Sequence, residues 1–207
     1  IFLGQVLAPG PLATFLLGHR FLQAMAVFRH MPFYTNIPRM ASAYRSDNLA
    51  TLWSLVRPGV NRTFMLIVLG LSGLHFLGPQ ILLWVSPAVE FPSVLLWALF
   101  ALLALTDRLV GLLGQMNLVR NKIIIHLANG ATGVAILGLL FPLTYLFGAA
   151  GAVLSMIVPL LVINMPIGFY YLYGFEGGIF ARFILRQFLV FSILQAGIIL
   201  LGIVLAE

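Results

Sequence analysis

The chain has 207 residues, of which 62% are hydrophobic and only 8% are charged, and its mean hydropathy is +1.10. Soluble domains carry roughly 25% charged residues, so this composition excludes an ordinary soluble protein and predicts one that is embedded in lipid. The absence of cysteine excludes a disulfide framework and a thiolate metal site. The formal charge of +6 resides in short basic clusters between apolar runs, which indicates membrane topology and not nucleic-acid binding.

Six apolar runs are each long enough to cross a bilayer, which requires about 20 helical residues. These runs are residues 11–37, 63–85, 92–118, 123–145, 149–173 and 183–206. They are apolar on every face, unlike the alternating strands of a barrel, so each is predicted to be a transmembrane helix. We therefore expect residues 1–207 to form a single all-α membrane domain. Because the chain starts at Ile1 without an initiator Met, we expect it to be a fragment of a longer protein.

The first run contains a basic residue far from either end. Arg20 lies well inside it, with His19 beside it and Gln23 one turn later. A charge at bilayer depth costs about 2.5–3.5 kcal/mol on insertion scales, so it usually faces a bundle interior or a wet cavity. We expect Arg20 to bind an anion or to pair with an acid. His19 either extends that basic site or makes a helix contact, and Gln23 either lines a cavity or packs between helices.

Between the first and second runs, residues 48–56 predict a short amphipathic helix. The apolar positions that share one helical face are Leu49, Leu52, Trp53 and Val56. Such a helix is expected to lie along the membrane surface. Asp47 or Asn48 can cap its start, and Pro58 with Gly59 is expected to end it before the next span.

The third run carries Asp107 and Arg108 near its centre. Adjacent helical residues point about 100° apart, so these two side chains cannot easily neutralise each other across one face. A pair between Arg20 and Asp107 is therefore favoured. Two interpretations stay open, namely a purely structural ion pair and a role in handling a substrate or an ion, and the rarity of intramembrane charge favours the second.

The fourth and fifth runs contain polar residues, and small residues at 148–152 between them offer a surface for close helix approach. Asn129, Thr132 and Asn164 are expected either to line a polar cavity or to make interhelical hydrogen bonds. Five prolines are expected to kink or end their helices: Pro32, Pro38, Pro142, Pro159 and Pro166.

The charges between the runs alternate and so predict orientation. Eight of the eleven basic residues fall on the same side of the predicted topology: Arg39, Arg45, Arg57, Arg62, Arg120, Lys122, Arg182 and Arg186. The positive-inside rule makes that side cytoplasmic. Residues 39–62, 119–122 and 174–182 are then cytoplasmic, and the first span runs inward.

Motifs that a catalytic centre would need are absent from the sequence. It contains no HExxH, no glycine-rich phosphate loop followed by Lys, and no neighbouring acids of the kind that bind magnesium and a diphosphate. We therefore expect no enzyme activity, no cofactor and no metal site.

Three segments carry a resemblance to a known family. They are IPRMASAYRSDN at residues 37–48, LVRNK at residues 118–122, and FPLTYLFGAAGAVLSMIVPLL at residues 141–161. With their order along the chain, they resemble the polysaccharide flippase branch of the multidrug, oligosaccharidyl-lipid and polysaccharide exporter superfamily. The residues that match its patterns are Pro38, Arg39 and Asp47 after a helix end, and Gly148, Gly151 and Ala152 at a hairpin.

The resemblance implies part of a two-lobe, pseudo-symmetric exporter of the bacterial inner membrane with a central cavity. It implies that an undecaprenyl-diphosphate-linked oligosaccharide is flipped by alternating access, in contact with the bilayer and with possible polysaccharide-assembly machinery. Arg20, with His19 assisting, would then hold the diphosphate, because an arginine fork matches phosphate geometry. Asp107 would neutralise Arg20 or bind a coupling proton or sodium ion.

Other functions remain open from the sequence alone. A drug or toxin exporter of the same superfamily would prefer acids and aromatic residues to a deep arginine. A membrane-embedded enzyme of saccharide assembly would need a catalytic cluster, and a scaffold would not need charges at bilayer depth.

Overall fold

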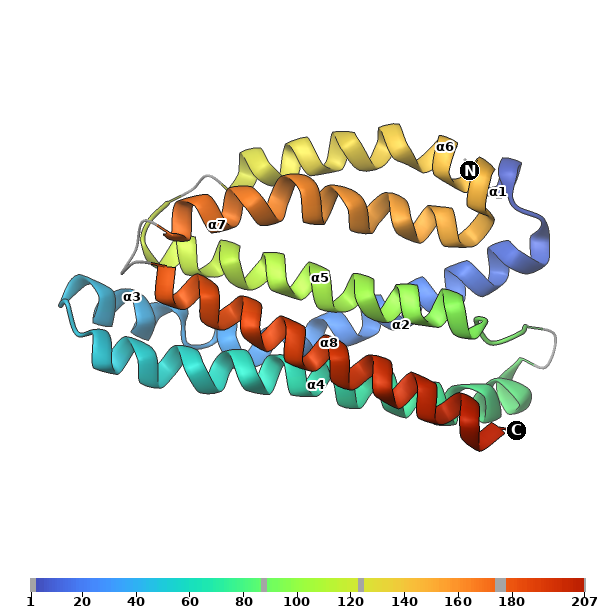
Figure 1. The fold of residues 1–207 in the computed structure, drawn as a ribbon, viewed down its shortest axis with the longest axis horizontal. Coiled ribbons are helices and arrows are strands. Elements are labelled where there is room, and N and C mark those ends of the chain that lie inside the picture. The colour runs from blue at the N-terminus through green and yellow to red at the C-terminus, as the bar shows by residue number, and fades with distance from the viewer. Residues whose placement is uncertain (1–2, 87–88, 123–124, 174–177, 207) are drawn as a thin grey trace.

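The computed structural model describes residues 3–86, 89–122, 125–173 and 178–206, and these are all-α. The helices in chain order are α1 (Leu3–Val6), α2 (Pro9–Tyr34), α3 (Ile37–Arg45), α4 (Leu49–Val85), α5 (Val94–Val119), α6 (Ile125–Pro159), η1 (Leu160–Asn164), α7 (Met165–Tyr173) and α8 (Ile179–Ala206). The long helices run antiparallel to their neighbours in the chain (Figure 1). Within these ranges the six apolar runs are mainly helical, and residues 123–124 of the fourth run lie outside the described residues.

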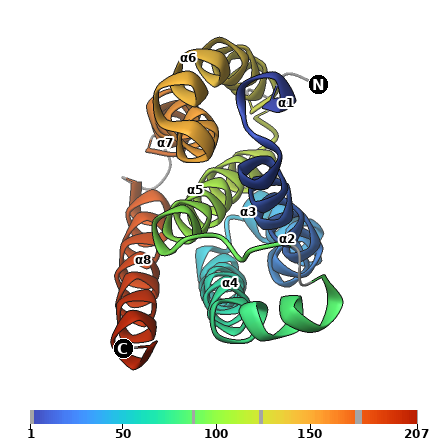
Figure 2. The same cartoon turned by 90° about the vertical axis from the view of Figure 1, so that its right-hand side faces the viewer.

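Helix α5 is the centre of the bundle. It contacts α2, α3, α4 and α8 as well as α6, η1 and α7. Seen end-on, α6 and α7 lie on one side of α5, while α2, α4 and α8 lie on the other (Figure 2). Within the most apolar part of α5, 61% of the residues are buried, against 17% in α8. Helix α5 is therefore the core helix, whereas α8 presents most of its surface to the surroundings.

Four helical segments in the described parts of the chain are long and apolar enough to cross a membrane. They are Leu49–Val85, Val94–Val119, Ile125–Tyr173 and Ile179–Val204. The protein is thus an all-α protein with the character of a multi-pass membrane protein. The predicted first span corresponds to α2, which is not among the four.

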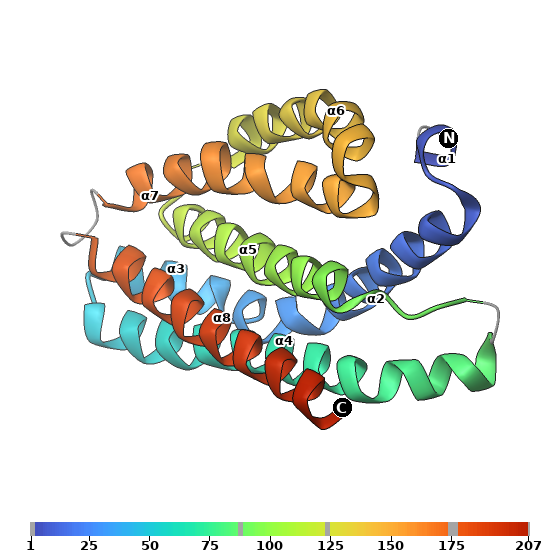
Figure 3. The ribbon, with the colours of Figure 1, turned by 45° about the vertical axis from the view of Figure 1, so that its right-hand side comes forward.

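The longest apolar segment folds back on itself at Gly148. This residue has φ 60° and ψ −139°, outside the helical region, whereas the residues around it are helical. Only glycine adopts such angles readily, because it lacks a Cβ. A Cβ on Gly151 would collide with the backbone carbonyl of Leu143, so the two arms also approach too closely for any side chain there. Figure 3 shows α6 turning back on itself beside α5, at the segment where the family resemblance implies a hairpin.

The structure differs from the predicted surface helix at residues 48–56. Asn48 caps α4, and residues 49–56 form the first turns of this helix, which continues through Pro58 to Val85. Leu52 and Val56 are fully buried, and Trp53 stacks on Phe180 of α8 with 4.5 Å between ring centroids. The apolar face is thus covered by neighbouring helices and not by the membrane surface. The predicted capping is confirmed, because the Asn48 side chain accepts a 2.9 Å hydrogen bond from the Thr51 N–H.

The prolines affect the helices unequally. Pro32 and Pro142 lie inside helices that continue past them, and Pro38 lies in the first turn of α3, where a missing N–H leaves no hydrogen bond unmade. Only after Pro159 does the hydrogen-bond pattern change, from α6 to the π-helix η1. Single π-helical turns inside α-helices occur frequently at functional sites.

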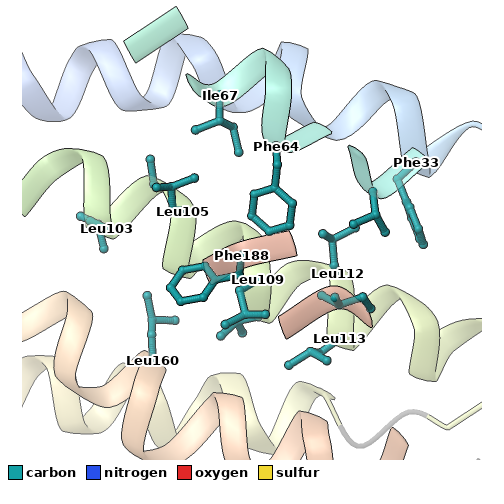
Figure 4. Close-up of a cluster of buried hydrophobic side chains, with 14 of the residues drawn as sticks. Phe33, Phe64, Ile67, Leu103, Leu105, Leu109, Leu112, Leu113, Leu160 and Phe188 are labelled. Atoms are coloured by element: carbon teal, nitrogen blue, oxygen red, sulfur yellow. The ribbon is translucent and has the colours of Figure 1, made fainter. Parts of the chain in front are cut away.

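The packed core lies between α5 and the helices α2, α4 and α8. Phe33, Phe64, Leu109 and Leu112 are fully buried, and with Phe188 of α8 they belong to one cluster of buried side chains (Figure 4). The Phe64 and Phe191 rings stack with their centroids 5.7 Å apart. This contact holds α4 against α8 and leaves the opposite side of α5 for the cavity described next.

Candidate functional site

A cavity of about 300 Å³ lies where α2, α5, α6 and η1 meet. Three polar side chains line it: His19 and Gln23 of α2 and Asp107 of α5. The apolar lining includes Ala26, Ile136, Met156 and Leu160. His19 lies near the middle of α2 and Asp107 near the middle of α5, so the polar groups lie near mid-length of these two helices.

His19 and Gln23 form one polar wall of this cavity. They are four residues apart on α2, and Gln23 Nε2 lies 3.1 Å from His19 Nε2, so the amide donates to the imidazole. The His19 ring also stacks on Phe15, with ring centroids 6.1 Å apart. His19 is half-buried and Gln23 is exposed. Because Gln23 both lines the cavity and reaches the surface of the bundle, it marks the cavity mouth.

Arg20 lies at this mouth and not inside it. It is exposed and does not line the cavity. Residues three apart on a helix share a face, so Arg20 flanks Gln23 on α2. Asp107, which was expected to pair with Arg20, is half-buried and lines the cavity from α5, so the two residues lie on different surfaces. The structure thus brings His19, Gln23 and Asp107 together and places Arg20 at the rim.

Asp107 and Arg108 point to different regions, as the helical geometry predicted. Arg108 is fully buried, and its Nη2 donates to Gln115 Oε1 at 3.1 Å. Its guanidinium also lies 6.0 Å from the centre of the Phe33 ring, within cation–π range. Arg108 therefore belongs to the packed core, and of these two neighbours only Asp107 lines the cavity.

Asn129 and Asn164 make an interhelical hydrogen bond, which was the packing alternative of the sequence analysis. Asn164 Nδ2 donates to Asn129 Oδ1 at 2.8 Å, and Asn164 is 4% exposed. This contact joins the first arm of α6 to the end of η1. Thr132 is also buried. None of the three lines the cavity, but the asparagine pair anchors the π-helical segment that contributes Leu160 to its wall.

The apolar part of the wall was not found from the sequence. Ile136, Met156 and Leu160 occur in runs that are apolar on all faces, so no periodicity distinguishes the cavity-facing residues. Pro159, next to Leu160, was the one residue that indicated an irregular helix at this wall, because a proline inside an apolar run kinks or ends a helix. Across the described ranges, no three His, Asp or Glu side chains gather in a way that could hold a metal ion.

Comparisons with known proteins give no further assignment. The chain matches no family model, no curated protein and no solved structure.

Proposed function

We propose that this bundle is one lobe of a membrane exporter that flips a lipid-diphosphate-linked oligosaccharide by alternating access. The observation that carries the proposal is the cavity near mid-length of α2 and α5, with His19, Gln23 and Asp107 in its wall and Arg20 at its mouth. Polar and charged groups at bilayer depth are costly and usually line a substrate or ion pathway. The resemblance to polysaccharide flippases supports the same function.

The size of the cavity assigns it to part of the substrate. A volume of about 300 Å³ is at the lower limit of small-molecule sites and is too small for an oligosaccharide. It suits an ion or a part of a phosphate group. The saccharide would occupy a wider space outside the mouth, between this bundle and a second lobe. The exposed Arg20 lies on that face of α2, where an arginine against lipid tails would be unfavourable.

Arg20 and Asp107 then have separate tasks. Arg20 at the mouth would hold the diphosphate, because the guanidinium offers paired N–H donors that match phosphate oxygens. Asp107 inside the cavity would bind the coupling proton or sodium ion, with His19 beside it as a second titratable group. This division replaces the direct pair between Arg20 and Asp107 expected from the sequence.

The π-helical turn next to the cavity supports a moving wall. Leu160 lines the cavity and begins η1, directly after Pro159. Interrupted helices beside a mid-membrane site are typical of transporters that work by alternating access. In this proposal the protein crosses the bacterial inner membrane six times, the two arms of Ile125–Tyr173 count as two crossings, and the end with residues 39–62, 119–122 and 174–182 faces the cytoplasm.

The test replaces Arg20 in the full-length protein, in cells that depend on it for surface polysaccharide. Arg20→Gln is expected to abolish the polysaccharide while the protein remains in the membrane at its normal level. Arg62→Gln is the matched control, because Arg62 is also an exposed arginine but lies on α4 and does not line the cavity. Export at the wild-type level in Arg20→Gln would remove the role assigned to Arg20.

One observation favours a drug exporter of the same superfamily as the second candidate. The charge inside the cavity is that of the acid Asp107, which would attract a cationic drug, whereas Arg20 lies outside. A strain that lacks the protein distinguishes the two functions. Loss of polysaccharide with unchanged drug sensitivity supports the flippase, and raised sensitivity to cationic drugs with normal polysaccharide supports the drug exporter.

A further inference from the structure

A second hollow lies between α4 and α8, separate from the cavity beside α5. We call it the basic groove. Its volume is about 830 Å³, and its lining includes Trp53 and Arg57 of α4 and Phe183, Arg186 and Gln187 of α8. On α8 these residues are spaced at helical repeats, so they form one face of that helix. None of the residues that line the groove is acidic.

The two arginines of the basic groove have no protein partner within the described part of the chain. Both are exposed, and neither makes an ion pair or a hydrogen bond to a described residue. By contrast, Arg120 at the same end donates to the Tyr171 carbonyl at 2.6 Å. Two cations that share one groove without an acid repel each other, so an anion in the groove would be held by both.

The depth of the groove suggests where that anion comes from. Helix α4 has 37 residues, so it is about 55 Å long and extends beyond a hydrocarbon core of roughly 30 Å. Arg57 lies within the first third of α4 and Arg186 within the first third of α8. Both are near the end that carries the basic loops, at a level where lipid headgroups begin. Trp53 is typical of that level, because tryptophan is enriched at membrane interfaces.

The groove also has an apolar wall that continues toward lipid. Trp53 packs edge-on against Phe183 with ring centroids 5.3 Å apart, and Val190 lines the groove one turn deeper on α8. Helix α8 is the least buried of the four candidate spans. A ligand with an anionic head and an apolar tail matches this combination better than a free anion, because the tail could lie along the exposed face of α8.

We propose that the basic groove binds the phosphate group of an anionic phospholipid from the leaflet at the basic end of the bundle. Arg57 and Arg186 hold the phosphate from two helices, and the first methylenes of the acyl chains lie against Phe183 and Val190. The lipid would thereby connect α8 to α4 at the end where both arginines line the groove. This site is distinct from the cavity at Asp107 and does not depend on the proposed transport function.

The test measures quenching of Trp53 fluorescence in the full chain, reconstituted with brominated lipids. The background variant is Trp84→Phe, because Trp84 is 90% exposed at the other end of α4 and would be quenched by any lipid, whereas Trp97 is fully buried. Brominated phosphatidylglycerol is compared with brominated phosphatidylcholine of the same acyl chains. We expect the anionic lipid to quench Trp53 at a several-fold lower mole fraction, and this preference to decrease as salt is raised.

Variants of the groove give the sharper result. Each of Arg57→Gln and Arg186→Gln is expected to lower the preference for phosphatidylglycerol about fivefold, the effect of one basic residue near an anionic surface. Arg62→Gln is the matched control, since Arg62 is an exposed arginine of α4 that does not line the groove. It should leave the preference unchanged.

Two outcomes overturn the proposal. Equal quenching by the two lipids in the background variant, or an unchanged preference when both arginines are replaced, would show that the groove does not select an anionic headgroup. Release of the lipid by inorganic phosphate at low millimolar concentration, with sulfate as the ionic-strength control, would assign the groove to a free phosphate instead. Retention of the lipid under those conditions supports the lipid as the source.

Discussion

The immediate surroundings of α5 differ on its two sides: side chains pack closely against it on one side, and a cavity borders it on the other. On the filled side, Phe64, Leu109 and Leu112 are fully buried among α2, α4 and α8. On the hollow side, α5 borders a cavity of about 300 Å³ that contains Asp107. In lipid there is little hydrophobic force between helices, so the filled side supplies stability through close packing. The side with the cavity lacks part of that packing and contains Asp107. This is therefore the side where a function is expected.

Asp107 and Arg108 show the same division within two residues. Arg108 is enclosed in the core, where Gln115 and Phe33 surround its guanidinium, whereas Asp107 faces the cavity. A buried charge in the core fixes how helices pack, and a half-buried charge in a cavity can meet a substrate or an ion. The following predictions use paired substitutions to test this contrast.

The largest effect is expected at the hairpin that carries the outer wall of the cavity. Gly151→Val would drive a side chain into the Leu143 carbonyl, so the two arms of α6 would have to separate. We expect the free energy of unfolding to fall by more than about 4 kcal/mol, an exceptional value for one substitution. Gly138→Val is the control, because nothing lies within 4 Å of a Cβ there. Unfolding in mixed micelles measures both, and equal stabilities would contradict the described turn.

The next effect compares truncations on the two sides of α5. Phe64→Ala is expected to lower the free energy of unfolding by about 3 kcal/mol, at the low end for a buried phenylalanine because in lipid only packing is lost. Met156→Ala removes a side chain that already borders the cavity and is expected to cost less than about 1 kcal/mol. A cost for Met156→Ala as large as that for Phe64→Ala would show that the second side is not hollow.

The smallest effect on stability is expected when the cavity is filled. Ala26→Phe places a ring into the cavity, so the free energy of unfolding should change by less than about 1 kcal/mol while export stops. Ala101→Phe places the same ring into packed space, since Ala101 is 2% exposed, and should destabilise the protein by about 1–3 kcal/mol. Normal export in Ala26→Phe would separate the cavity from transport.

Most of the fold could be predicted because each of its features depends on local chemistry. Runs of apolar residues are long enough to become spans regardless of their neighbours. Gly148 turns the chain because of its own backbone freedom, and Asn48 caps α4 through its own side chain.

The features that could not be predicted depend on the rotation of each helix about its own axis, which decides the neighbour that each side chain meets. In a run that is apolar on all sides, periodicity does not define the rotation of the helix about its axis. The sequence therefore allowed a pair between Arg20 and Asp107, although the two residues lie on different surfaces. The same ambiguity explains the wrong surface helix at residues 48–56. The apolar face of these residues could pack equally well against a membrane surface or against helix α8. The stacking of Trp53 on Phe180 shows that it packs against α8.

The central claim is that water reaches the polar wall of the cavity near the middle of α2. Residues 1–207 contain no cysteine, so a thiol introduced among them is the only one in this part of the protein and reports its own surroundings. In intact membranes, Gln23→Cys is expected to react with a charged, water-soluble thiol reagent. Ile193→Cys, at a position on α8 that is 73% exposed on an apolar surface, should not react because it faces lipid. Reaction at position 193 with none at position 23 would contradict the cavity and the function proposed for it.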